Sequence, residues 1–132
     1  IIQEKISIPP LTEKRSNMRL GRGDVVLVPF PFTDLTSTKV RPAVIISATP
    51  QGEDIIIAFI SSVVSKPVGD TELLITSDHP GFSATGLKKD SVFKMSKLLT
   101  IHNTLILRRL GHISPAIQKE LDNLLKKAIG LI

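Results

Sequence analysis

Five short runs of β-branched and other apolar residues constrain the fold of this chain more than any other feature. Each run is bounded by glycine, proline, serine or aspartate, which is typical of β-strands separated by turns. The runs are Val25–Pro29, Pro42–Ala48, Ile55–Val64, Glu72–Thr76 and Ser91–Met95. Lys97–Ile101 and Leu105–Ile113 are weaker candidates. We therefore expect a mainly β fold built from short strands.

The segment Ile55–Ile60 is apolar at every position, which is typical of a strand buried on both faces. A curled sheet closed on itself, with a helix packed against it, would cover both faces. The helix is predicted near the end of the chain, with Ser114 as its N-cap and Pro115 as its first residue. Its apolar positions recur at helical spacing, at Ile117, Leu121, Leu124, Leu125 and Ala128. We expect Leu131 and Ile132 to dock on the body of the protein.

Composition bounds the class of protein. A chain of 132 residues fits one domain with a substantial core. The absence of cysteine excludes disulfides, thiolate zinc sites and a cysteine nucleophile, and it fits a cytoplasmic protein. No stretch approaches the ~20 apolar residues that span a bilayer, so no membrane partner is expected. The net charge of +5 favours polyanionic partners, and solubility alone is the alternative interpretation.

Residues 1–17 have no sustained apolar period, and Met18 stands just before the patterned part of the chain. We expect 1–17 to be an N-terminal extension that is not native, with Met18 as the natural start. Residues 18–132 would then form a single domain.

A rigid loop and one arginine predict an anion site. Pro29 and Pro31 end the first strand, because proline cannot donate to a strand ladder. Pro42 holds Arg41 extended at the mouth of the second strand. An arginine fixed there suits a phosphate. The alternative is a structural ion pair between Arg41 and Asp34 or Asp24.

Hydroxyl groups support the phosphate interpretation. Ser61 and Ser62 follow the long apolar strand, and two strand ends of a curled sheet can present a guanidinium and a hydroxyl to one cleft. His79 lies in a turn-rich loop and is a possible proton acceptor, although a solvated loop histidine is the better interpretation. The three histidines lack metal-ligand spacing, so neither a metal nor another cofactor is expected.

Several segments in register resemble the MazF/PemK toxin family of type II toxin–antitoxin systems. They are Gly23–Val26, Val40–Ile46, Ala58–Ser62, Gly86–Val92 and Leu99–Ile101, followed by the amphipathic helix. The resemblance covers Arg19 to the C-terminus. It implies a small SH3-like or CcdB-like β-barrel closed by a C-terminal helix, and a homodimer.

The resemblance also implies an activity: metal-independent, sequence-specific cleavage of single-stranded RNA. The 2′-hydroxyl attacks the adjacent phosphate and leaves a 2′,3′-cyclic phosphate and a 5′-hydroxyl. The partner would be an acidic antitoxin. Arg41 occupies the place of the family's catalytic arginine, and Ser61 falls where many members have a catalytic threonine. Ser62 is the fallback if the register shifts by one.

This chain departs from the family at two places. Ser96 stands where many members have an acidic residue, and the loop 29–39 lacks the histidine that some members carry. The proton acceptor therefore stays open among the histidines, the acids and a supporting Ser96. The loops Pro31–Lys39 and Lys66–Asp70 are expected to read the RNA sequence. The basic residues expected to contact RNA are Arg22, Lys39, Lys66, Lys88, Lys89 and Lys94.

Two other functions compete with cleavage. A toxin of the same fold could act by binding DNA gyrase, as the CcdB group does, through the end of the C-terminal helix. A degenerate member could bind RNA or an antitoxin without cutting. The Arg41-Pro42 and Ser61 motifs favour the nuclease over both alternatives.

Overall fold

The computed structural model describes residues 20–29, 39–47, 53–64 and 67–131. The predictions for residues 1–17, the proposed start at Met18, the loop 30–38 and Lys66 lie outside the described residues.

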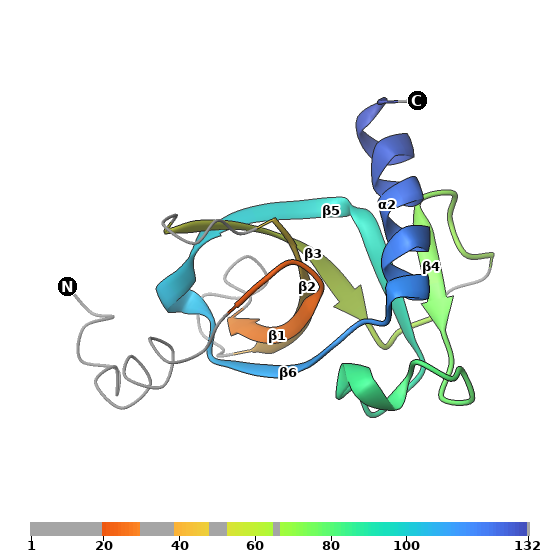
Figure 1. Ribbon diagram of the computed structural model, residues 1–132, viewed down its shortest axis with the longest axis horizontal. Helices are drawn as coiled ribbons and strands as arrows, with labels where there is room; N and C mark the ends of the chain where they lie inside the picture. Colours follow the sequence, from red (N-terminus) through yellow and green to blue (C-terminus); the bar gives the residue numbers. More distant parts are fainter. Residues whose placement is uncertain (1–19, 30–38, 48–52, 65–66, 132) are drawn as a thin grey trace.

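Six antiparallel strands form one curled sheet with the spatial order β4-β5-β3-β2-β1-β6 (Figure 1). In chain order the strands are β1 (Asp24–Pro29), β2 (Val40–Ser47), β3 (Asp54–Ser61), β4 (Glu72–Ile75), β5 (Ser91–His102) and β6 (Arg108–His112). Two short 3₁₀ helices, η2 (Ser83–Thr85) and η3 (Asn103–Leu105), lie in the connections. The helix α2 (Pro115–Ile129) comes last. The prediction of a mainly β fold with a C-terminal helix is confirmed.

β5 is one bent strand, where the sequence predicted two. Its first half pairs with β4 and the end of β3, and its second half pairs with the start of β3. Between the halves the register shifts, because Phe59 pairs with Lys94 while its neighbour Ala58 pairs with Leu98. The three residues 95–97 are therefore extra on β5 and form a bulge, which sharpens the bend of the strand.

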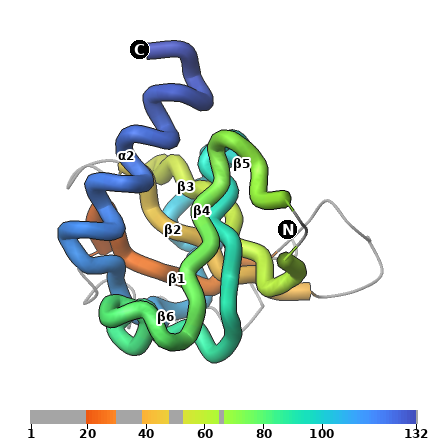
Figure 2. Tube along the Cα trace, turned by 90° about the vertical axis from the view of Figure 1, so that its right-hand side faces the viewer, coloured from red at the N-terminus to blue at the C-terminus, as the bar shows by residue number. Residues whose placement is uncertain are grey.

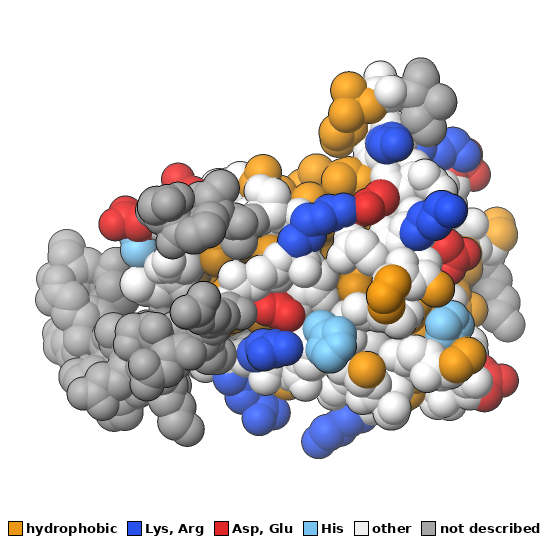
Figure 3. Space-filling model, viewed as in Figure 1, with side chains coloured by type: hydrophobic (Ala, Val, Ile, Leu, Met, Phe, Trp, Pro, Cys, Tyr) orange, Lys and Arg blue, Asp and Glu red, His pale blue; other side chains and the backbone are white. Residues whose placement is uncertain are grey.

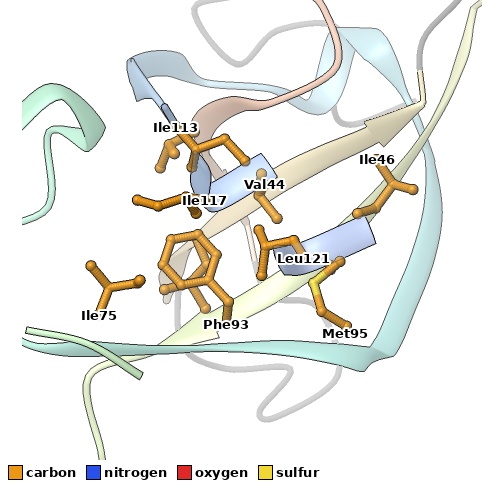
Figure 4. Close-up of a cluster of buried hydrophobic side chains, with 11 residues drawn as sticks. Val44, Ile46, Ile75, Phe93, Met95, Ile113, Ile117 and Leu121 are labelled. Atoms are coloured by element: carbon orange, nitrogen blue, oxygen red, sulfur yellow. The ribbon is translucent and has the colours of Figure 1, made fainter. Parts of the chain in front are cut away.

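The sheet carries a separate apolar cluster on each face, because residues alternate along a strand. The helix-side cluster contains Val44, Ile60, Phe93, Ile117 and Leu121, with α2 supplying the last two (Figure 4). The opposite cluster contains Val26, Val28, Ala43, Ile45, Ile55, Ile57, Ile101 and Ile106. The expectation of a sheet covered on both faces agrees with this arrangement.

The predicted cap of α2 is confirmed, since the Ser114 hydroxyl oxygen accepts the Ile117 N–H at 3.2 Å. Gly130 ends the helix with a positive φ of 77°. The expected docking is wrong for Leu131, and Ile132 lies outside the described residues. Leu131 is 70% exposed and Ile129 is 50% exposed, because the last turn of α2 extends past the sheet (Figure 1). Among the described residues, no helix is long and apolar enough to cross a membrane.

The η2 turn closes one edge of the sheet by lying against β6 (Figure 2). β6 pairs with β1 along its other edge. The connection between β4 and β5 therefore holds β6 from the outside, and it links the two ends of the sheet.

Candidate functional site

Arg41 lies one residue inside the start of a strand, and that strand begins two residues earlier than the predicted Pro42–Ala48. It is the second residue of β2, it pairs with Val28 of β1, and it is half-buried. The pairing of β2 with β3 begins only at Ala43. Pro42 pairs with Leu27 of β1 and stands just before the first β2–β3 pair, so its missing N–H removes no donor from the β2–β3 ladder.

Arg41 of β2 and Ser61 of β3 lie on adjacent strands, just beyond the last β2–β3 pair. Ala43 pairs with Phe59 in an antiparallel register. The same register continued by two residues brings Arg41 opposite Ser61, the last residue of β3. Directly opposed residues of an antiparallel pair present their side chains on the same face. Arg41 and Ser61 thus project their side chains from one face of the sheet at neighbouring strand ends.

That face lies opposite α2. Arg41 and Ala43 alternate with Pro42 and Val44, and Ala43 belongs to the cluster on the side away from the helix. Val44 belongs to the helix-side cluster. The candidate site is therefore separated from α2 by the thickness of the sheet.

The Ser61 hydroxyl is oriented by its own turn. Its Oγ accepts the Val63 N–H at 3.1 Å, and a longer contact of 3.4 Å joins it to the Val63 carbonyl. Ser61 is half-buried, whereas Ser62 is exposed beyond the end of β3. The local hydrogen bond restrains a side chain that lacks the methyl group of threonine.

The alternative ion pair between Arg41 and Asp24 is wrong. The two residues lie four positions apart along the β1–β2 register, about 13 Å of strand. The Asp24 carboxylate instead accepts the Gly21 N–H at 2.9 Å and lies 3.4 Å from Arg109 Nε. Asp34 lies outside the described residues.

A row of paired residues next to Arg41 and Ser61 was not predicted as a unit. Ala43 pairs with Phe59, Phe59 with Lys94, and Lys94 with Glu72. Their side chains share the face of Arg41 and Ser61. Lys94 was a predicted RNA contact, but Phe59 and Glu72 were missed. Only the strand register brings these residues together, and no local motif signals it.

The predicted proton-transfer candidates lie elsewhere. His79 Nδ1 accepts the Gly81 N–H at 2.9 Å. This turn lies beside the start of α2, because a methyl group placed on Gly81 would be 3.1 Å from Ser114 Oγ. Ser96 is exposed in the β5 bulge. Neither residue lies in the rows that contain Arg41, Ser61 and Lys94. Among the residues that the structure describes, no three His, Asp or Glu side chains gather as a metal site.

The other predicted RNA contacts are scattered. Arg22 forms an ion pair with Asp122 of α2 and donates to the Ile46 carbonyl at 3.3 Å, so it lies on the helix side of the sheet. Lys39 is exposed just before β2, and Lys88 and Lys89 are exposed before β5. Further basic side chains follow β6 along the lower edge of the view in Figure 3. Arg108 and Arg109, both exposed on β6, were not predicted as contacts.

Comparisons with known proteins agree with this architecture. Residues 21–129 match the family described as "PemK-like, MazF-like toxin of type II toxin-antitoxin system". No curated protein sequence matched the chain.

Three solved structures share the fold. An endoribonuclease in complex with its cognate antitoxin from a mycobacterial species has a TM-score of 0.64 at 18% identity, covering 86% of this chain and 98% of that chain. The Mycobacterium tuberculosis toxin MazF-mt6 has a TM-score of 0.64 at 18% identity, with coverages of 81% and 96%. MazE–MazF from Deinococcus radiodurans has a TM-score of 0.68 at 13% identity, with coverages of 88% and 100%.

Proposed function

This chain belongs to the PemK-like, MazF-like toxins of type II toxin–antitoxin systems, and from that premise we propose that it is an endoribonuclease toxin. Its substrate would be single-stranded RNA, cut at short sequence motifs without a metal ion. Two of the structures that share its fold are described as endoribonucleases, which supports the proposal.

The observation that carries the proposal is the opposition of Arg41 and Ser61 where the β2–β3 ladder ends. A guanidinium offers planar paired donors that match two phosphate oxygens, and it keeps its charge. A hydroxyl beside it offers one more donor. Together they form a small site that suits a phosphate in an RNA backbone.

The proposed chemistry is an internal transfer at phosphorus. The 2′-oxygen of one nucleotide forms a bond to the adjacent phosphorus, and the bond from phosphorus to the 5′-oxygen of the next nucleotide breaks. The 2′-hydroxyl loses its proton, and the leaving 5′-oxygen gains one. Arg41 would stabilise the charge that develops on the non-bridging oxygens, and Ser61 would donate to one of them. Both roles are those of donors, so the two proton transfers require other groups.

The proposal includes partners. A net charge of +5 suits both RNA and an acidic antitoxin that would compete for the same face. A structure of the same fold holds an antitoxin, which supports such a partner. We propose that the active form is a homodimer that acts on messenger RNA in the cytoplasm.

The test is cleavage of a long single-stranded RNA in EDTA, with the 5′ ends mapped. We expect specific cuts by the wild type that leave 5′-hydroxyl ends. Arg41→Ala should lower the rate by about 10²–10³, the usual loss when one donor to a developing charge is removed. Arg41→Lys should recover only part of the rate, because an ammonium lacks the planar fork. Ser61→Thr should stay active, and Ser61→Ala should not.

Lys119→Ala is the matched control, since it also removes one positive charge and Lys119 is exposed on α2, across the sheet from Arg41. Its rate should stay within about twofold of the wild type. Thermal unfolding of each variant separates a lost site from a lost fold, which matters because Arg41 is half-buried. Equal cleavage by wild type and Arg41→Ala would refute the proposed role of Arg41.

One observation favours a second candidate, a toxin that binds DNA gyrase. The end of α2 projects with Ile129 and Leu131 half or more exposed, and this is the surface on which such binding would rest. Growth arrest without RNA cleavage, lost on Leu131→Asp, would favour this function. Neither cleavage nor arrest would leave a degenerate member that only binds RNA or antitoxin.

A further inference from the structure

Lys94 differs from every other lysine that the structure describes. It is half-buried in β5, whereas Lys39, Lys88, Lys89, Lys97, Lys119, Lys126 and Lys127 are all exposed. Its position follows from the strand register, since it pairs with Phe59 on one side and Glu72 on the other. Its aliphatic stem is therefore held against the sheet, and this holds the ammonium at the end of the stem over the face that carries Arg41 and Ser61.

Among the residues that the structure describes, the carboxylate nearest in the strand pairing does not pair with the Lys94 ammonium. The Glu72 carboxylate is directed to its own turn, where it accepts the Gly69 N–H at 3.0 Å. Within the described part of the chain, no ion pair or hydrogen bond joins Lys94 to Glu72 or to any other residue. Phe59, its paired residue on the other side, is apolar and supplies no negative charge. An ammonium held over this face with no carboxylate partner among the described residues suits an anion that arrives with a ligand.

Lys94 also lies close to the candidate site. Ser61 pairs with Val92, two residues before Lys94 on the same strand, so the Ser61 and Lys94 side chains share a face. Along the sheet their Cα atoms are about 8 Å apart, and those of Arg41 and Lys94 about 12 Å. Lys94 lies on β5, on the far side of Ser61 from Arg41. An RNA strand whose scissile phosphate lies between Arg41 and Ser61, and which runs on across β3 toward β5, would bring its next phosphate over Lys94.

We propose that Lys94 forms a second phosphate subsite, which holds the phosphate next to the scissile one in single-stranded RNA. This inference rests on the proposed function, because the scissile phosphate is the one assigned to Arg41 and Ser61. Lys94 is then a positioning residue: it fixes the RNA register over Arg41 and takes no part in the bond changes. The Phe59 ring, next to it in the row, forms the apolar wall beside this subsite.

The first test measures binding without cleavage. A short random-sequence 2′-O-methyl RNA cannot react, because its 2′-oxygen carries a methyl group. Affinities for this RNA are measured over a range of salt concentrations for wild type, Lys94→Gln and Lys97→Gln. Lys97 is the matched control, a lysine three residues along the same strand but exposed in the bulge. Lys94→Gln should weaken binding about tenfold. It should also reduce the salt slope by about 0.7, the value for one phosphate contact on a single strand.

Lys97→Gln should leave affinity and slope close to the wild type. Lys94→Arg should keep the wild-type slope, and it guards against loss of binding through misfolding of the glutamine variant. Equal slopes for wild type and Lys94→Gln would overturn the subsite, as would equal losses in the two glutamine variants. Because this test needs no cleavage, it gives an answer even if the endoribonuclease proposal fails.

The second test separates positioning from chemistry. The Lys94→Gln variant should raise KM about tenfold on an oligonucleotide and leave kcat within about twofold. On a dinucleoside monophosphate, which has only the scissile phosphate, the variant and the wild type should have the same kcat/KM. A loss of equal size on both substrates would place Lys94 at the scissile phosphate and overturn the second subsite.

Discussion

Gly111 lies where two backbone segments cross without room for a side chain. A methyl group there would meet the Ala84 carbonyl oxygen at 2.1 Å and the Thr85 carbonyl carbon at 2.6 Å. Gly86, with a φ of 76°, makes the reciprocal approach to the Leu110 carbonyl oxygen at 2.2 Å. These backbone atoms belong to η2 and β6, so they cannot give way as the end of a flexible side chain could.

We predict that Gly111→Ala destabilises the protein by about 3 kcal/mol, because the η2 turn must move away from β6. Equilibrium urea unfolding followed by circular dichroism measures the change. Gly21→Ala is the control, since a methyl group at Gly21 meets nothing within 4 Å. It should change stability by no more than about 0.5 kcal/mol. Similar effects of both substitutions would mean that η2 and β6 separate at little cost.

At the level of single residues, the sequence predicted what local chemistry determines. Arg41 beside Pro42 and Ser61 at a strand end are readable because proline and a charged side chain have strong local meaning. Lys94 was named only as one basic residue among several, and Glu72 was missed. Their significance depends on which residues pair across three strands. Register is set by the whole sheet, so a linear pattern could not supply it.

At the level of elements, Arg22 joins the loop before β1 to helix α2. It forms an ion pair with Asp122, whose other carboxylate oxygen accepts the Gln118 side-chain amide at 3.0 Å. Arg22 also donates to the Ile46 carbonyl of β2. These contacts explain a basic residue that the sequence had suggested as an RNA contact, and they lie on the face opposite Arg41.

We therefore predict that Arg22→Ala leaves RNA affinity within about twofold of the wild type and lowers stability modestly. A double-mutant cycle with Asp122→Ala should give a coupling of about 0.5 kcal/mol, since both side chains are partly exposed. Chemical denaturation at low salt measures the coupling, and titration with 2′-O-methyl RNA measures the affinity. A tenfold loss of RNA affinity in Arg22→Ala would instead support the original RNA-contact prediction.

The elements themselves were predictable to different degrees. The first residue of α2 was predicted correctly from the sequence, because Ser114 and Pro115 are strong cap signals and the apolar spacing of the helix is regular. β5 was divided in two, because its apolar run is interrupted at Ser96 and Lys97. The structure keeps the strand continuous by placing these residues in a bulge. A bulge depends on pairing with another strand, which the sequence pattern does not show, so the interrupted apolar run indicates a strand end where the structure has none.

At the level of the whole molecule, the prediction of a sheet with apolar residues on both faces did not depend on the strand order. Fully apolar strands require cover on both sides whatever the strand order is. The strand order β4-β5-β3-β2-β1-β6 was beyond sequence reasoning, because it depends on long-range pairings. That order decides which side chains share the face with Arg41. The fold class was therefore predictable from the sequence, whereas the set of side chains that share the face with Arg41 was only partly predictable.

The two apolar clusters should nevertheless unfold as one unit. Strand β2 contributes Val44 to the helix-side cluster and Ile45 to the opposite one, so neither cluster can open without disturbing the same strand. We predict that Ile117→Val and Ile57→Val, one in each cluster and both fully buried, each lower stability by about 1 kcal/mol. The double variant should lose the sum within about 0.5 kcal/mol, because the two side chains belong to different clusters.

All three variants should unfold in one transition, because strands shared by both clusters couple them. The chain has no Trp or Tyr, so far-UV circular dichroism and the NMR signals of buried methyl groups are the two probes. Coincident curves from both probes are expected. If the methyl signals of Ile117→Val disappear at lower denaturant than the circular dichroism, α2 and its cluster detach first. The face that carries Arg41, Ser61 and Lys94 would then keep its structure without the helix, and RNA binding would survive loss of α2.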